Sequence, residues 1–222
     1  MTNNEITKLL KLLNDNKLEE LKAELTAQLM KTTDKKKAST FNEIKKYLSK
    51  ADAFRPILKT IQYNSGKQFI CNGFTAYRFD TYRPELNMLP NTSDLESLNI
   101  NALINNYAEY IKLNENDLTI LKNIKKYISL YKTQDFYMKK QNIPVFFANK
   151  IFNADFILEC VGIFGGDYDN LKMYNKEKEY EGIQLKSNDI TAIILPLRIN
   201  SEEEKNKTIE FTNKFIENIK NI

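Results

Sequence analysis

Two aspartates and a Gln-x-Lys pair are the residues whose types and spacing could support catalysis. Asp167 and Asp169 follow a double glycine, and Gln184 and Lys186 lie two residues apart further along the chain. Restriction-type nucleases hold Mg²⁺ between carboxylates while a lysine orients the attacking water. The two aspartates are, however, more typical of a turn that follows a helix. A magnesium-dependent, restriction-type nuclease is therefore the last of three hypotheses for function.

The remaining residue types argue against catalysis. The chain contains no histidine and two cysteines, Cys71 and Cys160, both within apolar stretches. The absence of histidine excludes the usual Ser-His and Cys-His nucleophile pairs, and two thiols cannot fill the tetrahedral shell of a zinc ion. Two buried free thiols are more usual than a disulfide in the cytosol. We therefore expect no catalytic residues, no metal and no cofactor.

Composition narrows the class of protein further. The 222 residues carry a net charge of +4, and 42% are hydrophobic and 28% charged, which are ordinary values for a globular chain. No apolar run approaches the roughly 20 residues that span a bilayer, and the N-terminal stretch is too polar for a secretory signal. We expect a cytoplasmic protein without membrane contact. Its charge permits anionic partners but does not require them.

Three lysines form a basic group on a short predicted helix. Thr40 and Glu43 have the spacing of a capping box, which opens a helix that carries Lys45, Lys46 and Lys50. Phosphate contacts need basic side chains, so these lysines are candidate contacts for double-stranded DNA. A solvated helix face is the alternative interpretation.

The ends of the chain predict helices. Between residues 4 and 32, leucine and isoleucine recur at intervals of three and four, apart from an interruption at Asn14-Asp15-Asn16. The polar segment 32–40 predicts a linker. These patterns divide the chain into a helical arm and linker (1–39), a main domain (40–200) and an amphipathic C-terminal helix (201–222) that is led by Ser201.

The main domain is expected to be α+β, with strands on both sides of a helical insert at about 96–142. Helices are predicted at 101–112, 115–133 and 153–164, and Gly165 suits the C-terminal cap of the last. Asn72-Gly73 between two apolar runs predicts a hairpin. Strands are predicted at 55–64, 67–71, 75–82, 143–152, 170–175, 181–187 and 190–199. A helix followed by three strands therefore occurs twice around the insert.

Two segments resemble the bacterial DNA polymerase sliding clamp, the beta subunit that tethers polymerase to DNA. The first runs from Arg55-Pro56-Ile57-Leu58 through Asn72-Gly73-Phe74 to Tyr77-Arg78-Phe79. The second begins at Phe152-Asn153 and ends at Leu195-Pro196-Leu197-Arg198-Ile199, like the terminal Pro-x-Arg-Leu strand of a clamp. Together they cover residues 40–200, about one clamp domain. Asn72 replaces the aspartate of the family turn, and the helix at 153–164 lacks the basic residues that face DNA in a clamp.

The resemblance implies a fold of two helices backed by antiparallel sheets and a hydrophobic groove that captures short peptides of replication or repair proteins. The residues that it assigns to this groove are Arg78, Phe79, Leu195, Pro196, Leu197, Arg198 and Ile199. The alternative interpretation of residues 194–199 is a buried strand in which the proline marks a bulge or the end. The first hypothesis is therefore a non-catalytic, clamp-fold binding protein linked to DNA replication or repair. An origin in a phage or mobile element and assembly into a homo-oligomer are compatible with it.

The second hypothesis is a standalone interaction or inhibitor protein. Its contact surfaces would be the N-terminal arm (4–32) and the C-terminal tail (201–221), since an amphipathic helix can dock on a partner as well as on its own domain. Substitution in the groove should damage binding under the first hypothesis but not under the second.

Overall fold

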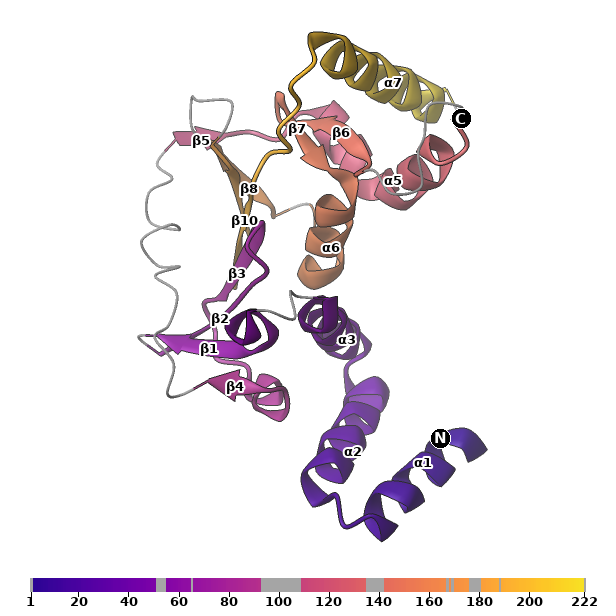
Figure 1. The fold of residues 1–222 in the computed structure, drawn as a ribbon, viewed down its shortest axis with the longest axis vertical. Helices are drawn as coiled ribbons and strands as arrows, with labels where there is room; N and C mark the ends of the chain where they lie inside the picture. The colour runs from indigo at the N-terminus through magenta and orange to yellow at the C-terminus, as the bar shows by residue number, and fades with distance from the viewer. Residues whose placement is uncertain are drawn as a thin grey trace.

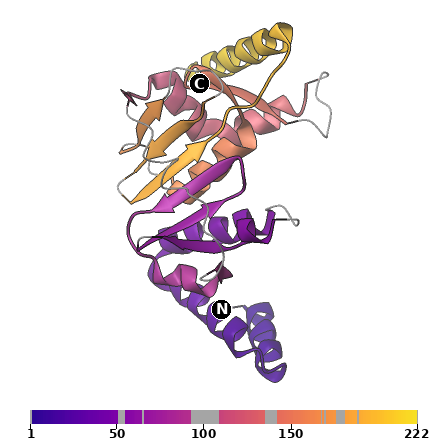
Figure 2. The ribbon, with the colours of Figure 1, turned by 60° about the vertical axis from the view of Figure 1, so that its left-hand side comes forward.

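The computed structural model describes residues 2–50, 55–64, 66–92, 109–134, 142–166, 168, 170–175, 181–187 and 189–221. In this part of the chain, helices pack on a twisted and largely antiparallel sheet, so the predicted α+β class is confirmed (Figure 1). A helical arm extends from one end of the molecule, and the C-terminal helix lies at the other end (Figure 2).

The main sheet has eight strands in the order β4-β1-β2-β3-β10-β9-β8-β5. The strands are β1 (Ile61–Asn64), β2 (Lys67–Cys71), β3 (Thr75–Phe79), β4 (Asn91–Thr92), β5 (Glu109–Ile111), β8 (Lys172–Asn175), β9 (Ile183–Lys186) and β10 (Ile190–Ile194). At its centre β3 pairs antiparallel with β10, from Thr75 opposite Ile194 to Phe79 opposite Ile190. This pairing joins the strands of residues 61–79 and of residues 172–194 into one sheet.

Two helices lie side by side on one face of this sheet: α3 (Lys35–Lys50) and α6 (Ala154–Phe164) (Figure 1). The Tyr47 hydroxyl of α3 donates a hydrogen bond to the Thr75 backbone oxygen at 2.8 Å, and its ring packs edge-on against Tyr77. The order α3-β1-β2-β3 is repeated as α6-β8-β9-β10, with the two halves meeting at the β3–β10 pair. The predicted repeat of a helix and three strands is therefore present.

Gly162 explains how closely α3 and α6 approach. A Cβ atom at this position would lie 2.9 Å from Cγ of Glu43 on α3, closer than real Cβ contacts allow. Gly165 then ends α6 with a φ of 66°, a left-handed conformation that glycine adopts at little cost. The C-terminal cap expected there is confirmed.

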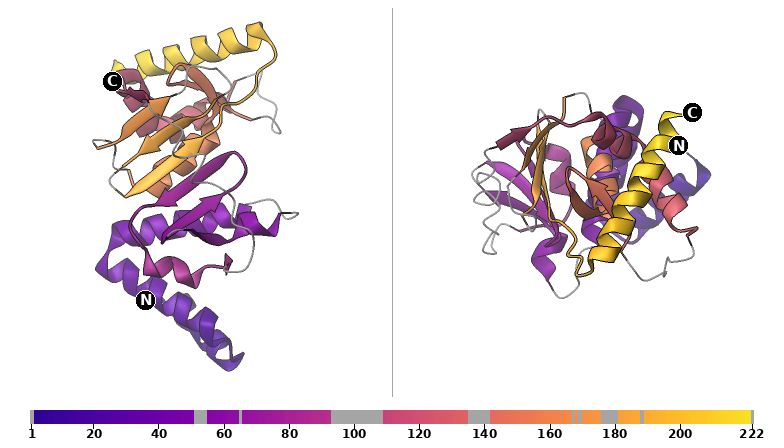
Figure 3. Two further views of the ribbon diagram at one scale, coloured as in Figure 1. Left: turned by 90° about the vertical axis from the view of Figure 1, so that its left-hand side faces the viewer. Right: turned by 90° about the horizontal axis from the view of Figure 1, so that it is seen from above.

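A second packing layer is formed by α5 (Glu115–Tyr131), α7 (Glu202–Lys220) and the two-stranded sheet of β6 (Pro144–Phe147) and β7 (Lys150–Asn153). Tyr127 of α5 connects them, because its hydroxyl donates to the Pro144 backbone oxygen at 2.8 Å and its ring packs edge-on against Phe215 of α7. Ser201 caps α7 as predicted, by accepting a hydrogen bond from the Glu204 backbone nitrogen. The C-terminal helix therefore packs on α5 and β6 (Figure 3).

The arm consists of α1 (Asn3–Asn14) and α2 (Leu18–Thr33), and the predicted interruption between them is confirmed. The predicted linker at 32–40 is wrong, because α3 begins at Lys35 and Asp34 alone separates it from α2. Asp34 accepts a hydrogen bond from the Lys37 backbone nitrogen, and lysine and alanine are good helix formers. The domain boundary predicted at residue 39 consequently falls within a helix.

The single strand predicted at 143–152 is a hairpin of β6 and β7, which turns at Ala148 and Asn149. Three other predictions of secondary structure are corrected. Pro56–Lys59 form a 3-10 helix in place of the start of a strand. Glu109–Ile111, predicted as helix, form the edge strand β5, while residues 101–108 lie outside the described part of the chain. The last strand ends at Ile194 because Pro196 has no backbone N–H to extend the ladder. In the first two cases proline geometry and pairing with β8 outweighed the local pattern.

Candidate functional site

An exposed apolar patch lies where β10 ends. It consists of Phe74, Phe156 and Leu195, and we call it the strand-end patch. Phe74 is 60% exposed and Leu195 is 40% exposed. The rings of Phe74 and Phe156 stack with centroids 5.6 Å apart, and the Leu195 backbone nitrogen donates to the Phe74 backbone oxygen at 2.9 Å. Three segments that are distant in the chain are therefore held together at the surface.

The hairpin turn between β2 and β3 positions the most exposed member of this patch. Oδ1 of Asn72 accepts hydrogen bonds from the backbone nitrogens of Phe74 and Thr75, at 2.9 and 2.8 Å. Gly73 has a φ of 93°, which a residue with a side chain rarely adopts. The hairpin predicted from Asn72-Gly73 is confirmed, and its turn fixes Phe74 at the tip.

The five C-terminal residues assigned to a groove follow one another along the surface beyond β10. Leu195 and Arg198 are exposed, and Pro196, Leu197 and Ile199 are half-buried. The Leu197 backbone nitrogen donates to the Ile151 backbone oxygen at 2.8 Å, which fixes this segment beside β7. The segment is thus accessible on one side.

Arg78 and Phe79, the other two predicted groove residues, lie elsewhere. Because β3 and β10 are antiparallel, Phe79 pairs with Ile190, four residues before the end of β10. Phe79 is completely buried, under the guanidinium of Arg83, whose carbon lies 5.1 Å from the ring centroid. Neither residue can therefore share a surface with Leu195, and this part of the predicted groove is wrong.

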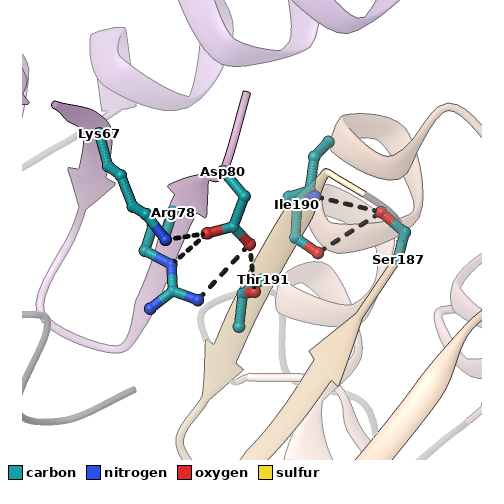
Figure 4. A network of polar contacts seen from close by, with 6 residues as sticks. All are labelled: Lys67, Arg78, Asp80, Ser187, Ile190 and Thr191. Carbon is teal, nitrogen blue, oxygen red and sulfur yellow. Dashed lines mark hydrogen bonds and ion pairs between the residues drawn. The ribbon is translucent and has the colours of Figure 1, made fainter. Parts of the chain in front are cut away.

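Arg78 instead belongs to a polar network on the sheet (Figure 4). Asp80 accepts hydrogen bonds from Lys67 Nζ at 2.8 Å, Arg78 Nε at 2.8 Å and Thr191 Oγ1 at 3.1 Å. Burial by itself would raise the pKa of Asp80, but the two cations outweigh that effect and lower it. Asp80 therefore stays ionised and balances the charge of a nearly buried arginine.

The predicted DNA contacts lie on the exposed side of α3. Lys50 pairs with Glu159 of α6 at 3.0 Å, and Lys46 lies 3.7 Å from Glu43. Burial raises the pKa of Glu159, and the hydrogen bond from Lys50 opposes that shift. Phosphate binding at Lys46 or Lys50 would have to break these ion pairs.

A groove of about 1280 Å³ separates the arm from the body of the protein. Its apolar lining includes Met30, Phe41, Leu48 and Met88. Ion pairs cross or border the groove at Lys8–Glu24 and Lys37–Glu85, with distances of 2.6 and 3.2 Å. Lys45, the third predicted DNA contact, lines it as well. No local pattern in the sequence indicates this groove, because its walls come from separate helices.

The residues behind the nuclease hypothesis are only partly described. Gln184 is buried and Lys186 half-buried on β9, while Asp167 and Asp169 lie outside the described residues. Among the residues that the structure describes, no group of three or more acidic or cysteine side chains could hold a metal ion. Cys71 and Cys160 are free thiols, and burial raises the pKa of both.

Comparisons with known proteins found no matching family model, no matching curated protein and no matching solved structure. No helix in the described part of the chain is long and apolar enough to cross a membrane.

Proposed function

We propose that the chain is a non-catalytic binding protein built on a sliding-clamp-like domain, and that it captures a short peptide of a replication or repair protein at the strand-end patch. The observation that carries this proposal is the stacked pair Phe74–Phe156 beside the exposed Leu195, at the end of the strand that resembles the last strand of a clamp.

The arrangement of the elements supports a clamp-like domain. The two resembling segments pair through β3 and β10, and their helices, α3 and α6, lie together on one face of the sheet. A fold with two helices backed by antiparallel strands is what the resemblance implies. The eight-stranded sheet and the added layer of α5 and α7 are particular to this chain.

The chemistry of the patch indicates the kind of peptide. Two aromatic rings and a leucine offer an apolar contact surface, and large aromatic or aliphatic anchors give most of the binding energy in such contacts. The exposed Arg198, three residues beyond Leu195, suits an acidic side chain or a C-terminal carboxylate. A peptide with one or two apolar anchors and a nearby carboxylate fits both features.

The proposal is tested with peptides from DNA polymerases, clamp loaders and repair proteins, compared with shuffled sequences of the same composition. Fluorescence anisotropy measures their dissociation constants for the full chain. We expect Leu195→Asp to weaken binding of a selected peptide at least tenfold, since it places a charge in the apolar contact.

Leu130→Asp is the matched control, because Leu130 on α5 is 39% exposed, nearly the same as Leu195. It should leave the dissociation constant unchanged. If no peptide binds better than its shuffled form, or if Leu195→Asp binds as tightly as the original chain, the proposed function is wrong.

A further inference from the structure

The arm carries a concentration of exposed aliphatic side chains. Six large hydrophobic residues of α1 and α2 are between 40% and 61% exposed: Ile6, Leu10, Leu13, Leu18, Leu25 and Leu29. We call them the arm stripe. Single exposed leucines are ordinary, whereas several on one element mark a surface that another apolar surface covers.

Two side-chain contacts fix which sides of α1 and α2 face each other. Lys8 Nζ lies 2.6 Å from Glu24 Oε2, and Gln28 Nε2 donates to Glu5 Oε1 at 3.1 Å. Because the earlier residue of α1 pairs with the later residue of α2, the two helices run antiparallel. Leu9, the residue after Lys8 and one helical turn after Glu5, is buried.

Helix geometry then places the whole arm stripe on one side of the hairpin. Successive residues of an α-helix are rotated by about 100°. On α1, Ile6 and Leu10 each follow a residue at the contact between the helices, Glu5 and Leu9, and are rotated from it by one step. On α2, Leu25 and Leu29 follow the contact residues Glu24 and Gln28 in the same way. In antiparallel helices the same step on each helix leads to the same side of the pair. The stripe is thus a continuous face.

Most charges of the arm lie away from the centre of this face. By the same geometry Lys8, Lys11 and Glu24 lie at the contact between the helices or on the opposite side. Lys22 is the exception, since it is exposed and lies at the outer edge of the stripe on α2. At the rim of a two-fold contact its methylene stem can cover apolar surface while its ammonium group stays in water. The centre of the face carries no charge, so two such faces meet there without like-charge contacts.

The size of the stripe agrees with a contact between two copies. Six half-exposed aliphatic side chains present on the order of 500 Å² of apolar surface. Two copies would bury on the order of 1000 Å² in total, which is near the lower limit for a specific interface. A two-fold pairing of helical hairpins is also the common architecture of a four-helix bundle.

We infer that the arm is a self-association surface, and that two copies of the chain pair through their arm stripes into a four-helix bundle. The contact is self-complementary, so it closes at two copies. Such a dimer carries two strand-end patches, and a partner with two peptide segments would then bind more tightly through both than through either alone.

Light scattering on the full chain tests this inference over a range from low to high micromolar concentration. We expect the mass to rise from one chain to two. Leu10→Asp with Leu25→Asp should weaken self-association at least tenfold and keep the protein at the mass of one chain. Leu13→Gln with Leu29→Gln, which adds no charge and keeps good helix formers, should act in the same direction. Leu130→Asp should dimerise as the original chain does.

Far-UV circular dichroism and the unfolding midpoint show that each variant is folded before its mass is interpreted. The inference is overturned if the original chain keeps the mass of one copy throughout, in which case an amphipathic segment of another protein is the better candidate for this face. It is also overturned if the folded arm variants dimerise unchanged. Peptide binding at the strand-end patch is measured separately, so either proposal can fail without the other.

Discussion

Asp80 is the acceptor that permits a nearly buried arginine in the sheet. Arg78 is 8% exposed, and its Nε donates to Asp80 at 2.8 Å, while Lys67 and Thr191 use the remaining lone pairs. A buried charge that loses its partner retains its full desolvation cost. Arg78, which was predicted to line a groove, thus serves the stability of the sheet.

Asp80→Asn should destabilise the fold by about 1–3 kcal/mol at neutral pH, because the amide leaves the Arg78 charge uncompensated. The pKa of Asp80 in the folded chain lies below its ordinary value of 3.8. Its contribution is therefore complete above that value and is lost as the pH falls through the lower, folded pKa. The stability difference between the two proteins should shrink in strong acid, which urea unfolding at several pH values measures.

Asp189→Asn is the control for this substitution. Asp189 pairs with Arg83 at 2.6 Å, but its side chain is 41% exposed. An exposed pair contributes about 0–1 kcal/mol, so we expect a smaller loss than at Asp80. An Asp80→Asn protein that is as stable as the original at neutral pH would contradict the role assigned to the network.

At the scale of elements, the contact between α3 and α6 depends on a glycine in the middle of a helix. Glycine lowers helix stability by about 1 kcal/mol relative to alanine. At Gly162 this cost has a packing reason, since the side chain of Glu43 occupies the space of the missing Cβ. The same two helices are joined at their exposed side by the Lys50–Glu159 pair.

Gly162→Val should destabilise the chain by about 1–3 kcal/mol, because a branched side chain would push α3 away from α6. Glu43→Ala in the same chain should recover part of the loss by emptying the contested space. Gly162→Ala should cost less than Gly162→Val, since its single Cβ requires a smaller shift of the Glu43 side chain and it regains helix propensity. Urea unfolding of the original chain and the three variants measures these differences. If Glu43→Ala gives no recovery, the clash is not the cause.

At the scale of the whole molecule, one hydrophobic core runs from Met30 in the arm to Ile216 in the C-terminal helix. Tyr127 connects α5, β6 and α7 within it, and α5 also packs on α6. The arm, the main domain and the C-terminal helix, which the sequence pattern divides, therefore share one hydrophobic core. The same continuity leaves α7 with little free apolar surface, in contrast to the exposed stripe of the arm.

Phe215→Ala should accordingly weaken the whole fold and not α7 alone. Phe215 is 2% exposed, and truncation of a buried phenylalanine costs about 3–5 kcal/mol. We expect one unfolding transition at a lower urea midpoint, with tyrosine fluorescence and far-UV circular dichroism coincident. Leu130→Ala, at an exposed position, should leave the midpoint nearly unchanged. A separate early transition of α7 would argue for an independent C-terminal part.

The amino-acid sequence by itself determined the features whose hydrogen bonds close within a few residues. Ser201 begins a helix, Gly165 ends one, and Asn72-Gly73 makes the hairpin turn. The capping box predicted at Thr40 and Glu43 is the exception, since both residues lie inside α3, which begins at Lys35. The spacing of apolar residues also predicted the repeat of a helix and three strands, because this spacing differs between helices and strands.

Only the tertiary structure decided which distant residues meet. The sequence analysis placed Phe79 and Leu195 in one groove. Antiparallel pairing of β3 with β10 instead places Phe79 far from Leu195 and Phe74 beside Leu195. Glu109–Ile111 form a strand because they pair with β8. Lys50 forms an ion pair with Glu159, which lies on another helix. Each outcome depends on a contact between residues far apart in the chain, about which local propensity and spacing carry no information.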